Sequence, residues 1–158
     1  MNKPPLLLTL LAILATPAWA AKFNPDAMKT MQDQGLKVAD EAAGLAPLKA
    51  AGKCLSPSGD NAKAGSALTV GECKDKSGQR WRFDGAGRLM NGDGLCLGLD
   101  GKPDQIGAKG QLADCASAPN WKHDEQGRIV SSDGKCLEAA GKGVQLKECG
   151  AGEGQVWR

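Results

Sequence analysis

One stretch of sequence occurs in two clear copies and one faded copy, and this repetition constrains the fold more than any other feature. The clear copies are residues 127–137 (GRIVSSDGKCL) and 87–97 (GRLMNGDGLCL). The faded copy ends in residues 52–55 (GKCL), and residues 46–49 stand in the place of its first strand. Each copy predicts two short strands joined by a turn. A unit that occurs three times predicts a fold assembled from three similar parts.

Short predicted strands follow one another from residue 45 to the end of the chain, four in each unit. The units span about 45–84, 87–124 and 127–158. Regularly spaced short strands with turns between them indicate a sandwich or a barrel, so the predicted class is all-β. Threefold repetition favours a closed object without open edge strands, with the first and last strands side by side. The predicted strands are Pro47–Lys49, Lys53–Ser56, Ala67–Glu72 and Arg80–Phe83, then Arg88–Asn91, Leu95–Leu99, Gly110–Asp114 and Asn120–His123, then Arg128–Ser131, Lys135–Glu138, Val144–Lys147 and Val156–Arg158.

The cysteines follow the same repetition, with one early and one late cysteine in each unit. This arrangement selects one pairing among those that six cysteines allow. A metal site is the competing interpretation, but the chain has no Cys-x-x-Cys motif and one histidine, His123, so we expect neither metal nor cofactor. The predicted disulfides are Cys54–Cys73, Cys96–Cys115 and Cys136–Cys149.

The first twenty residues have the composition of a secretory signal peptide. Lys3 supplies a positive start, Leu6–Leu14 is an apolar run, and residues 18–20 (AWA) fit cleavage after Ala20. The apolar run is too short to span a membrane. We therefore expect an exported protein, secreted or periplasmic, in which disulfides persist.

Residues 21–44 precede the repeats and predict a helix over about 25–42. Asn24 is a capping residue, Pro25 suits the first helical position, and Gly44 is a plausible stop. Three interpretations remain open for this segment: the helix packs on the following domain, it binds a protein partner, or the segment is disordered. The positions at helical spacing are Met28, Met31, Gly35, Val38, Ala39 and Ala42.

Three tryptophans occupy the same place in their units, shortly after the second cysteine: Trp81, Trp121 and Trp157. In a chain without tyrosine and with two phenylalanines, tryptophans repeated in this way predict core residues, because each ring buries a large apolar area. A platform for a ligand is the alternative. Gln79 and Gln155 each stand two residues before a tryptophan.

Charge and motifs exclude several functions. Removal of Lys3 with the signal peptide leaves 19 Lys and Arg against 18 Asp and Glu, a net charge of +1, and the two signs are interspersed. No basic stripe with aromatic residues is present, so we expect no nucleic-acid binding, and near-neutrality gives no reason to expect membrane binding. Motifs of hydrolases, zinc proteases and P-loop enzymes are missing from the sequence, so we expect no enzymatic activity.

Taken together, these features resemble the ricin B-type lectin family, a β-trefoil of three Gln-x-Trp units. The resemblance covers residues 45–158 and implies a β-trefoil of three four-stranded repeats, preceded by the short helical segment 21–44. The matching residues are Cys54-Leu55, Cys96-Leu97 and Cys136-Leu137, the segments Gln111-Leu112 and Val144–Leu146, and the pairs Gln79/Trp81 and Gln155/Trp157.

In this family each repeat can hold a shallow sugar site. An acid follows the Cys-Leu pair, an aromatic residue follows the Gln-Leu pair, and an Asn precedes the Gln of Gln-x-Trp. These three positions are Ser56, Gly71 and Gly78 in the first repeat, Gly98, Ala113 and Ala118 in the second (with Asp100 close by), and Glu138, Lys147 and Gly154 in the third.

The third repeat alone keeps a polar pair, Glu138 and Gln145, so the resemblance implies at most one weak sugar site, with Glu138, Gln145, Lys147 and Gln155 as candidates. The alternative for Glu138 and Gln145 is that they are ordinary solvated strand residues. For the whole protein, the expectation is a monomeric, exported carbohydrate-binding module. The alternative is a trefoil that has lost sugar binding and acts as an inhibitor-like or scaffold protein through residues 21–44 or its loops.

Overall fold

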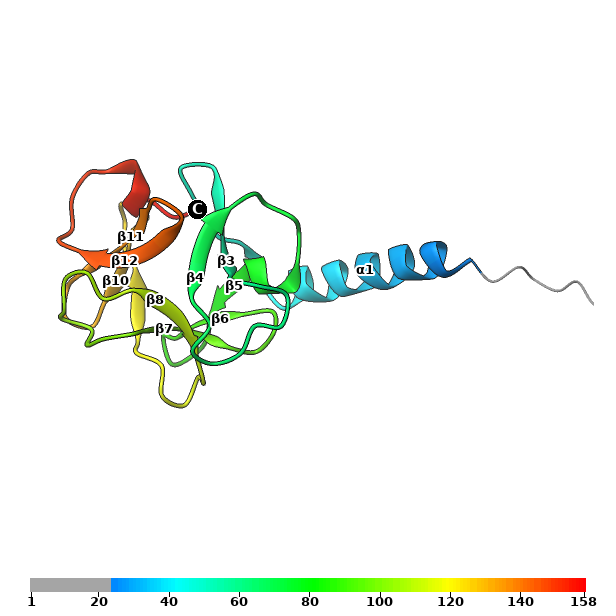
Figure 1. Ribbon diagram of the computed structural model, residues 1–158, viewed down its shortest axis with the longest axis horizontal. Coiled ribbons are helices and arrows are strands. Elements are labelled where there is room, and N and C mark those ends of the chain that lie inside the picture. The colour runs from blue at the N-terminus through cyan, green and yellow to red at the C-terminus, as the bar shows by residue number, and fades with distance from the viewer. Residues whose placement is uncertain (1–23) are drawn as a thin grey trace, which may run out of the picture.

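The computed structural model describes residues 24–158, so the predicted signal peptide at residues 1–20 lies outside the described residues. One helix, α1 (Pro25–Ala42), precedes a rounded domain of short strands (Figure 1). The domain is all-β apart from two single-turn 3₁₀ helices, η1 (Ser77–Gln79) and η2 (Glu153–Gln155). The fold class predicted from the repeats is confirmed.

Helix α1 has the bounds that its capping residues predicted. The side-chain Oδ1 of Asn24 accepts hydrogen bonds from the backbone N–H groups of Asp26, at 3.0 Å, and Ala27, at 3.3 Å. These bonds satisfy two of the donors that a helix leaves unpaired at its start. Gly44 follows the last turn with φ +74°, a left-handed conformation that glycine adopts without strain and that ends the helix.

The expectation that α1 packs on the following domain is wrong for the part of the helix whose side chains are described. The helix extends away from the strands (Figure 1), and Met28 and Met31 are 52% and 73% exposed. Residues 43–45 alone separate the helix from the first strand, and Leu45 is already buried. Two residues are therefore left to redirect the chain, and the helix points outward.

The strands form two sheets, ordered β1-β5-β6-β7-β8 and β2-β3-β4-β12-β11-β10-β9. All neighbouring strands in these sheets pair antiparallel, and the pattern repeats along the chain. The strands are β1 (Ala46–Pro47), β2 (Lys49–Ala50), β3 (Lys53–Pro57), β4 (Leu68–Gly71), β5 (Arg80–Phe83), β6 (Leu89–Asn91), β7 (Cys96–Leu99), β8 (Gly110–Ala113), β9 (Trp121–His123), β10 (Ile129–Ser131), β11 (Cys136–Ala140) and β12 (Gly143–Lys147).

The two ends of the domain lie side by side, as predicted. The backbone of Lys49 donates to Arg158 at 2.7 Å and accepts from it at 2.8 Å. The predicted last strand, Val156–Arg158, forms only isolated bridges, to Ala50 and Arg128. The 3₁₀ turn η2 stands immediately before these residues. These bonds give β2, the edge strand of the larger sheet, a partner on its outer side.

Three hairpins, β3–β4, β7–β8 and β11–β12, come together around an approximate threefold axis (Figure 1). One bridge joins each pair of neighbouring hairpins. The bridges are Ala67↔Gln111, Lys109↔Gln145 and Gly143↔Thr69. Each hairpin contributes one residue to each of two bridges, so the bridges show which residues of the three hairpins are equivalent.

Each repeat carries its own disulfide and its own buried tryptophan. The three predicted cysteine pairs are confirmed, with sequence separations of 19, 19 and 13 residues. Trp81, Trp121 and Trp157 are at most 3% exposed, so the core interpretation is confirmed over the platform interpretation. The core around them consists mainly of leucines, among them one from each Cys-Leu pair.

Candidate functional site

The hairpin of the third repeat brings Glu138 and Gln145 together. They lie directly opposite each other in the pairing of β11 with β12, and both are half-buried. Lys147 lies on the same face of β12 as Gln145, because side chains two residues apart point the same way along a strand. Lys147 is exposed. Three of the four residues that the sequence singled out therefore share one surface.

The fourth, Gln155, lies beneath that surface and is only 3% exposed. Its Oε1 accepts from the backbone N–H of Gly150 at 2.8 Å. Its Nε2 donates to the Glu148 carbonyl at 3.0 Å and to the Glu138 carboxylate at 2.9 Å. The amide is therefore fully engaged. Gln155 positions the loop after the last disulfide and orients Glu138, and it does not itself face outward.

The bond from Gln155 leaves Glu138 half engaged. Oε2 is held, and no other side chain in residues 24–158 takes up the remaining oxygen, Oε1. A carboxylate can accept several hydrogen bonds at once. Glu138 is thus an oriented acceptor at a half-buried position, which is the geometry that adjacent hydroxyl groups of a ligand need.

The first repeat contains the same arrangement with a hydroxyl in place of the carboxylate. The Nε2 of Gln79 donates to Ser56 Oγ at 2.7 Å and to the Glu72 carbonyl at 2.9 Å, and its Oε1 accepts from the Lys74 backbone at 2.6 Å. Like Gln155, Gln79 is buried. This shared structural role of the two glutamines was not predicted. Their common position before a tryptophan was the available signal.

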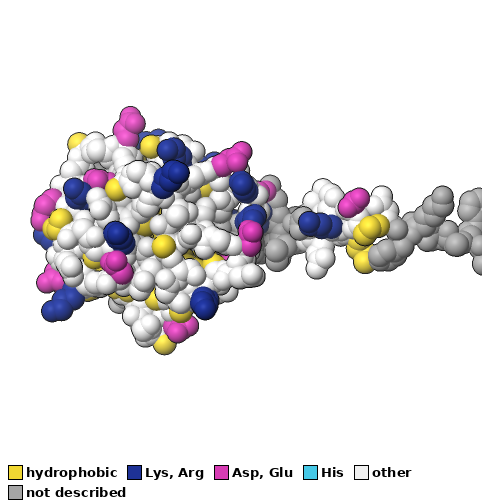
Figure 2. Space-filling model, viewed as in Figure 1, with side chains coloured by type: hydrophobic (Ala, Val, Ile, Leu, Met, Phe, Trp, Pro, Cys, Tyr) yellow, Lys and Arg dark blue, Asp and Glu magenta, His cyan; other side chains and the backbone are white. Residues whose placement is uncertain are grey.

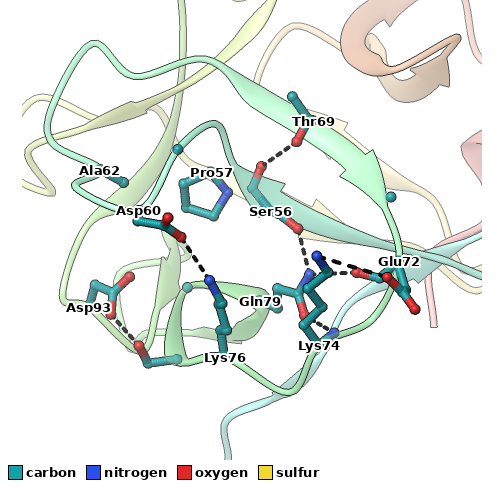
Figure 3. Close-up of a pocket in the computed structure, with 14 residues that line it drawn as sticks. Ser56, Pro57, Asp60, Ala62, Thr69, Glu72, Lys74, Lys76, Gln79 and Asp93 are labelled. Atoms are coloured by element: carbon teal, nitrogen blue, oxygen red, sulfur yellow. Dashed lines mark hydrogen bonds and ion pairs between the residues drawn. The ribbon is translucent and has the colours of Figure 1, made fainter.

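A cavity of about 360 Å³ lies over this part of the first repeat (Figure 3). Its wall contains Ser56, Gly71 and Gly78, the three positions that the family pattern marks in this repeat. Polar side chains pair within it: Lys76 Nζ lies 2.8 Å from Asp60 Oδ1, and the Ser77 hydroxyl donates to Asp93. The sequence predicted no site here, because none of the three family positions holds the expected residue type.

The ion pair across this cavity also sets its electrostatics. The hydrogen bond from Lys76, followed by the positive charge of the same side chain, lowers the pKa of Asp60 from its ordinary value. Both groups are exposed to solvent, so their mutual attraction is screened by water and salt. A ligand that enters the cavity must compete with this pair.

The second repeat has no equivalent of either arrangement. Gly98 stands at the acid position, and a β carbon there would lie 2.6 Å from the β carbon of Ala113 on the facing strand. Pro119 replaces the glutamine that the other repeats place two residues before tryptophan. The second repeat therefore lacks the acid, the space that an acidic side chain would need, and the buried amide that would position it.

The charges on the described part of the molecule are scattered over the face in Figure 2, where Lys and Arg alternate with Asp and Glu. Within residues 24–158, no three His, Cys, Asp or Glu side chains gather as a metal ligand set. The one described helix is not long and apolar enough to cross a membrane.

The family model of the ricin-type β-trefoil lectin domain matches residues 45–157. This chain belongs to that family. No curated protein matches it significantly. Among solved structures, it is similar to an agglutinin from Abrus precatorius, with 23% identity, a TM-score of 0.63, and coverage of 70% of this chain and 46% of that one.

Two further lectin-fold structures are similar. A homologue of type II RIPs from Momordica charantia, bound to α-methyl-D-galactoside, shares 18% identity over 72% of this chain and 46% of its own, with a TM-score of 0.64. The ricin B-like lectin of Macrolepiota procera, bound to lactose, shares 21% identity over 70% of this chain and 89% of its own, with a TM-score of 0.57. The chain spans about half the length of the first of these relatives. At identities this low, it is the structural similarity that establishes a shared fold.

Proposed function

We propose that this protein is an exported carbohydrate-binding module whose sugar site lies on the third repeat. Membership of a lectin family supports carbohydrate as the ligand class. The oriented carboxylate of Glu138 is the observation that carries the choice of repeat. The three disulfides support an oxidising compartment, secreted or periplasmic.

In this proposal Glu138 accepts hydrogen bonds from two neighbouring hydroxyl groups of a sugar. Charge-assisted hydrogen bonds of this kind are stronger than neutral ones. Gln145, directly opposite on β12, adds an amide that can donate and accept. Lys147 adds an ammonium donor at the edge of the site. Gln155 keeps the carboxylate in place from beneath.

The site lacks an aromatic ring for the apolar face of the sugar, because Lys147 stands at that position. Ring stacking contributes on the order of 1 kcal/mol beyond its buried area. A millimolar dissociation constant corresponds to a binding free energy of only about 4 kcal/mol. We therefore expect a single weak site with a dissociation constant above 0.1 mM, which corresponds to a binding free energy weaker than about 5.5 kcal/mol.

A titration of residues 21–158 with lactose and with N-acetylgalactosamine, followed by ¹H–¹⁵N spectra, tests the proposal. These probes are taken from sugars bound by similar lectin structures. The expected shifts fall on residues 136–147 and on the side-chain amide of Gln155. Glu138→Gln keeps the side-chain shape, removes the charge, and should weaken the response about tenfold or more.

Asp60→Asn is the matched control, because it makes the same change of charge in the first-repeat cavity. It should leave the third-repeat shifts unchanged. Shifts confined to residues 56–79 that disappear in Asp60→Asn would contradict the choice of repeat. No response of a folded sample to any sugar at millimolar concentration would contradict carbohydrate binding itself.

A second function is supported by α1. This helix projects from the domain with two exposed methionines, Met28 and Met31, which a sugar-binding trefoil does not need. Methionine adapts to irregular apolar partners. We infer that a protein partner is the second candidate ligand. Removal of residues 21–44 would then abolish capture of that partner and leave the trefoil folded, whereas unchanged capture would contradict this role.

A further inference from the structure

A second cavity lies where the three hairpins meet, on the approximate threefold axis of the domain. Its volume is about 360 Å³, it is open to solvent, and residues of β4, β8 and β12 and their neighbours line it. The bridge Lys109↔Gln145 and the bridge Gly143↔Thr69 border it. It is therefore distinct from the repeat-specific positions that hold Ser56 and Glu138, although Gln145 adjoins both.

The floor and walls of this axial cavity are apolar and small. Leu68 and Val144 pack beneath it and are 2% and 3% exposed. A β carbon at Gly110 would lie 2.4 Å from Val144 Cγ2, so only glycine lets the strands approach this closely. Ala67 and Ala140 form the sides and leave the space between the hairpins open. A space of this size and character suits the face of one sugar ring.

The charge at the rim has one sign. Lys109 and Lys142 line the cavity, and none of its lining residues is acidic. Both lysines are exposed, and neither takes part in an ion pair within residues 24–158. Asp100, which is not among the lining residues, accepts from the backbone N–H of Lys109 at 2.5 Å, which engages one of its oxygens. The first-repeat cavity differs, because three acids, Asp60, Glu72 and Asp93, line it beside its lysines.

We propose that the axial cavity binds an acidic sugar, with Lys109 and Lys142 paired to its carboxylate or sulfate group and the small apolar walls against its ring. Lysine ammonium groups are strong donors to both kinds of anion. The inference takes carbohydrate as the ligand class from the proposed function, but it does not depend on the third-repeat site.

The test uses residues 21–158 and four probes: methyl β-glucuronide, galactose 6-sulfate, methyl β-glucoside and inorganic sulfate. ¹H–¹⁵N spectra should show shifts at Lys109, Gly110 and Gly143 with one or both acidic sugars. The neutral glucoside and inorganic sulfate should bind this position about tenfold more weakly or worse, because each offers only part of the recognised chemistry. The response to the acidic sugars should also weaken with added salt.

The double variant Lys109→Gln, Lys142→Gln should weaken binding of the acidic sugar about tenfold or more. Lys122→Gln is the control, since this exposed lysine on β9 lies outside the cavity. Ala67→Leu keeps both charges and fills the cavity, and it should also abolish the response. Glu138→Gln should leave it intact, which separates this site from that of the third repeat.

Three results would overturn the proposal. They are equal binding of inorganic sulfate, binding that survives Ala67→Leu, and shifts that appear only around Glu138. The last result would leave the proposed function standing. Conversely, shifts at the axial residues with none around Glu138 would support the axial site and contradict the site of the third repeat.

Discussion

The indole Nε1 of Trp157 donates a hydrogen bond of 2.9 Å to the backbone carbonyl of Leu137. The other two repeats contain the same bond, from Trp81 to Leu55 at 3.2 Å and from Trp121 to Leu97 at 3.1 Å. In every repeat the tryptophan thus ties the end of the unit to the Cys-Leu strand of the same unit. This bond lies beside the candidate sites, because the residue after each leucine is Ser56, Gly98 or Glu138.

Replacement of Trp157 by phenylalanine should destabilise the domain. The Leu137 carbonyl loses its indole donor in a fully buried environment, which costs about 1–3 kcal/mol, and the smaller ring leaves a cavity. Urea unfolding with the disulfides intact measures the change. Trp121→Phe should cost a similar amount, because its bond and burial are equivalent. A loss below about 0.5 kcal/mol in both variants would contradict the role assigned to this bond.

The disulfides should each stabilise the domain by about 3 kcal/mol, and nearly equally. The loop between Cys136 and Cys149 is six residues shorter than the loop between Cys54 and Cys73, since the separations are 13 and 19. In the loop-entropy account this difference changes the stabilisation by only about 0.3 kcal/mol. Paired Cys→Ala variants compared by urea unfolding test this. A difference of several kcal/mol would show that strain or residual structure dominates.

Acid should weaken the domain partly through Asp84. The backbone N–H of Arg88 bonds its carboxylate at 2.9 Å and, with the Arg88 side chain, holds the pKa of Asp84 below its ordinary value despite the opposing effect of burial. Because the folded-state pKa is lowered, this contribution is present above the unfolded-state pKa and is lost as pH falls through the folded-state pKa.

Asp84→Asn keeps the side-chain oxygen and removes the charge. It should lower stability at neutral pH and flatten the dependence of stability on pH below about 4. Thermal unfolding between pH 2 and 7 would show this. An unchanged slope would mean that the Asp84–Arg88 pair contributes nothing to stability. Asp124 and Arg128 form the equivalent pair at the junction of the second and third repeats, with a side-chain contact of 2.7 Å, and Asp124→Asn should behave alike.

Substitutions at positions 98 and 113 of the second repeat should be energetically coupled, because the two positions lie in close contact. Gly98→Ala places a β carbon 2.6 Å from that of Ala113 and should cost about 1–3 kcal/mol by overpacking. Ala113→Gly removes the clashing group, so the double variant should recover part of the loss. A double-mutant cycle measures the coupling. Additive effects of the two substitutions would contradict the close approach of these strands.

The repeats made much of this fold predictable. Two cysteines in each unit identified the three disulfides, and Trp81, Trp121 and Trp157 marked equivalent core positions. The limits of α1 followed from Asn24 and Gly44, because capping depends on local chemistry. The outward direction of α1 did not follow, since it depends on how the chain enters the first strand and not on the apolar stripe of the helix.

The candidate sites were less predictable. The family pattern gives the residue type expected at each position, but the shape of a site also depends on segments that lie far away in the sequence. Gln155 matched the family pattern, but its burial and its bond to Glu138 come from the 3₁₀ turn η2. The first-repeat cavity arises where the family residues are replaced by Ser56 and two glycines, so absence of the expected types hid it. The axial cavity involves all three repeats, and no single unit indicates it.

A broad glycan array probed with residues 21–158, disulfides intact, beside the Glu138→Ala variant tests the central claim most directly. We expect the protein to bind one or more glycans and the Glu138→Ala variant to lose the neutral ones, because the variant removes the oriented acceptor. Retention of every neutral glycan by Glu138→Ala would contradict the site of the third repeat. A blank array from a well-folded sample would contradict carbohydrate binding as the function.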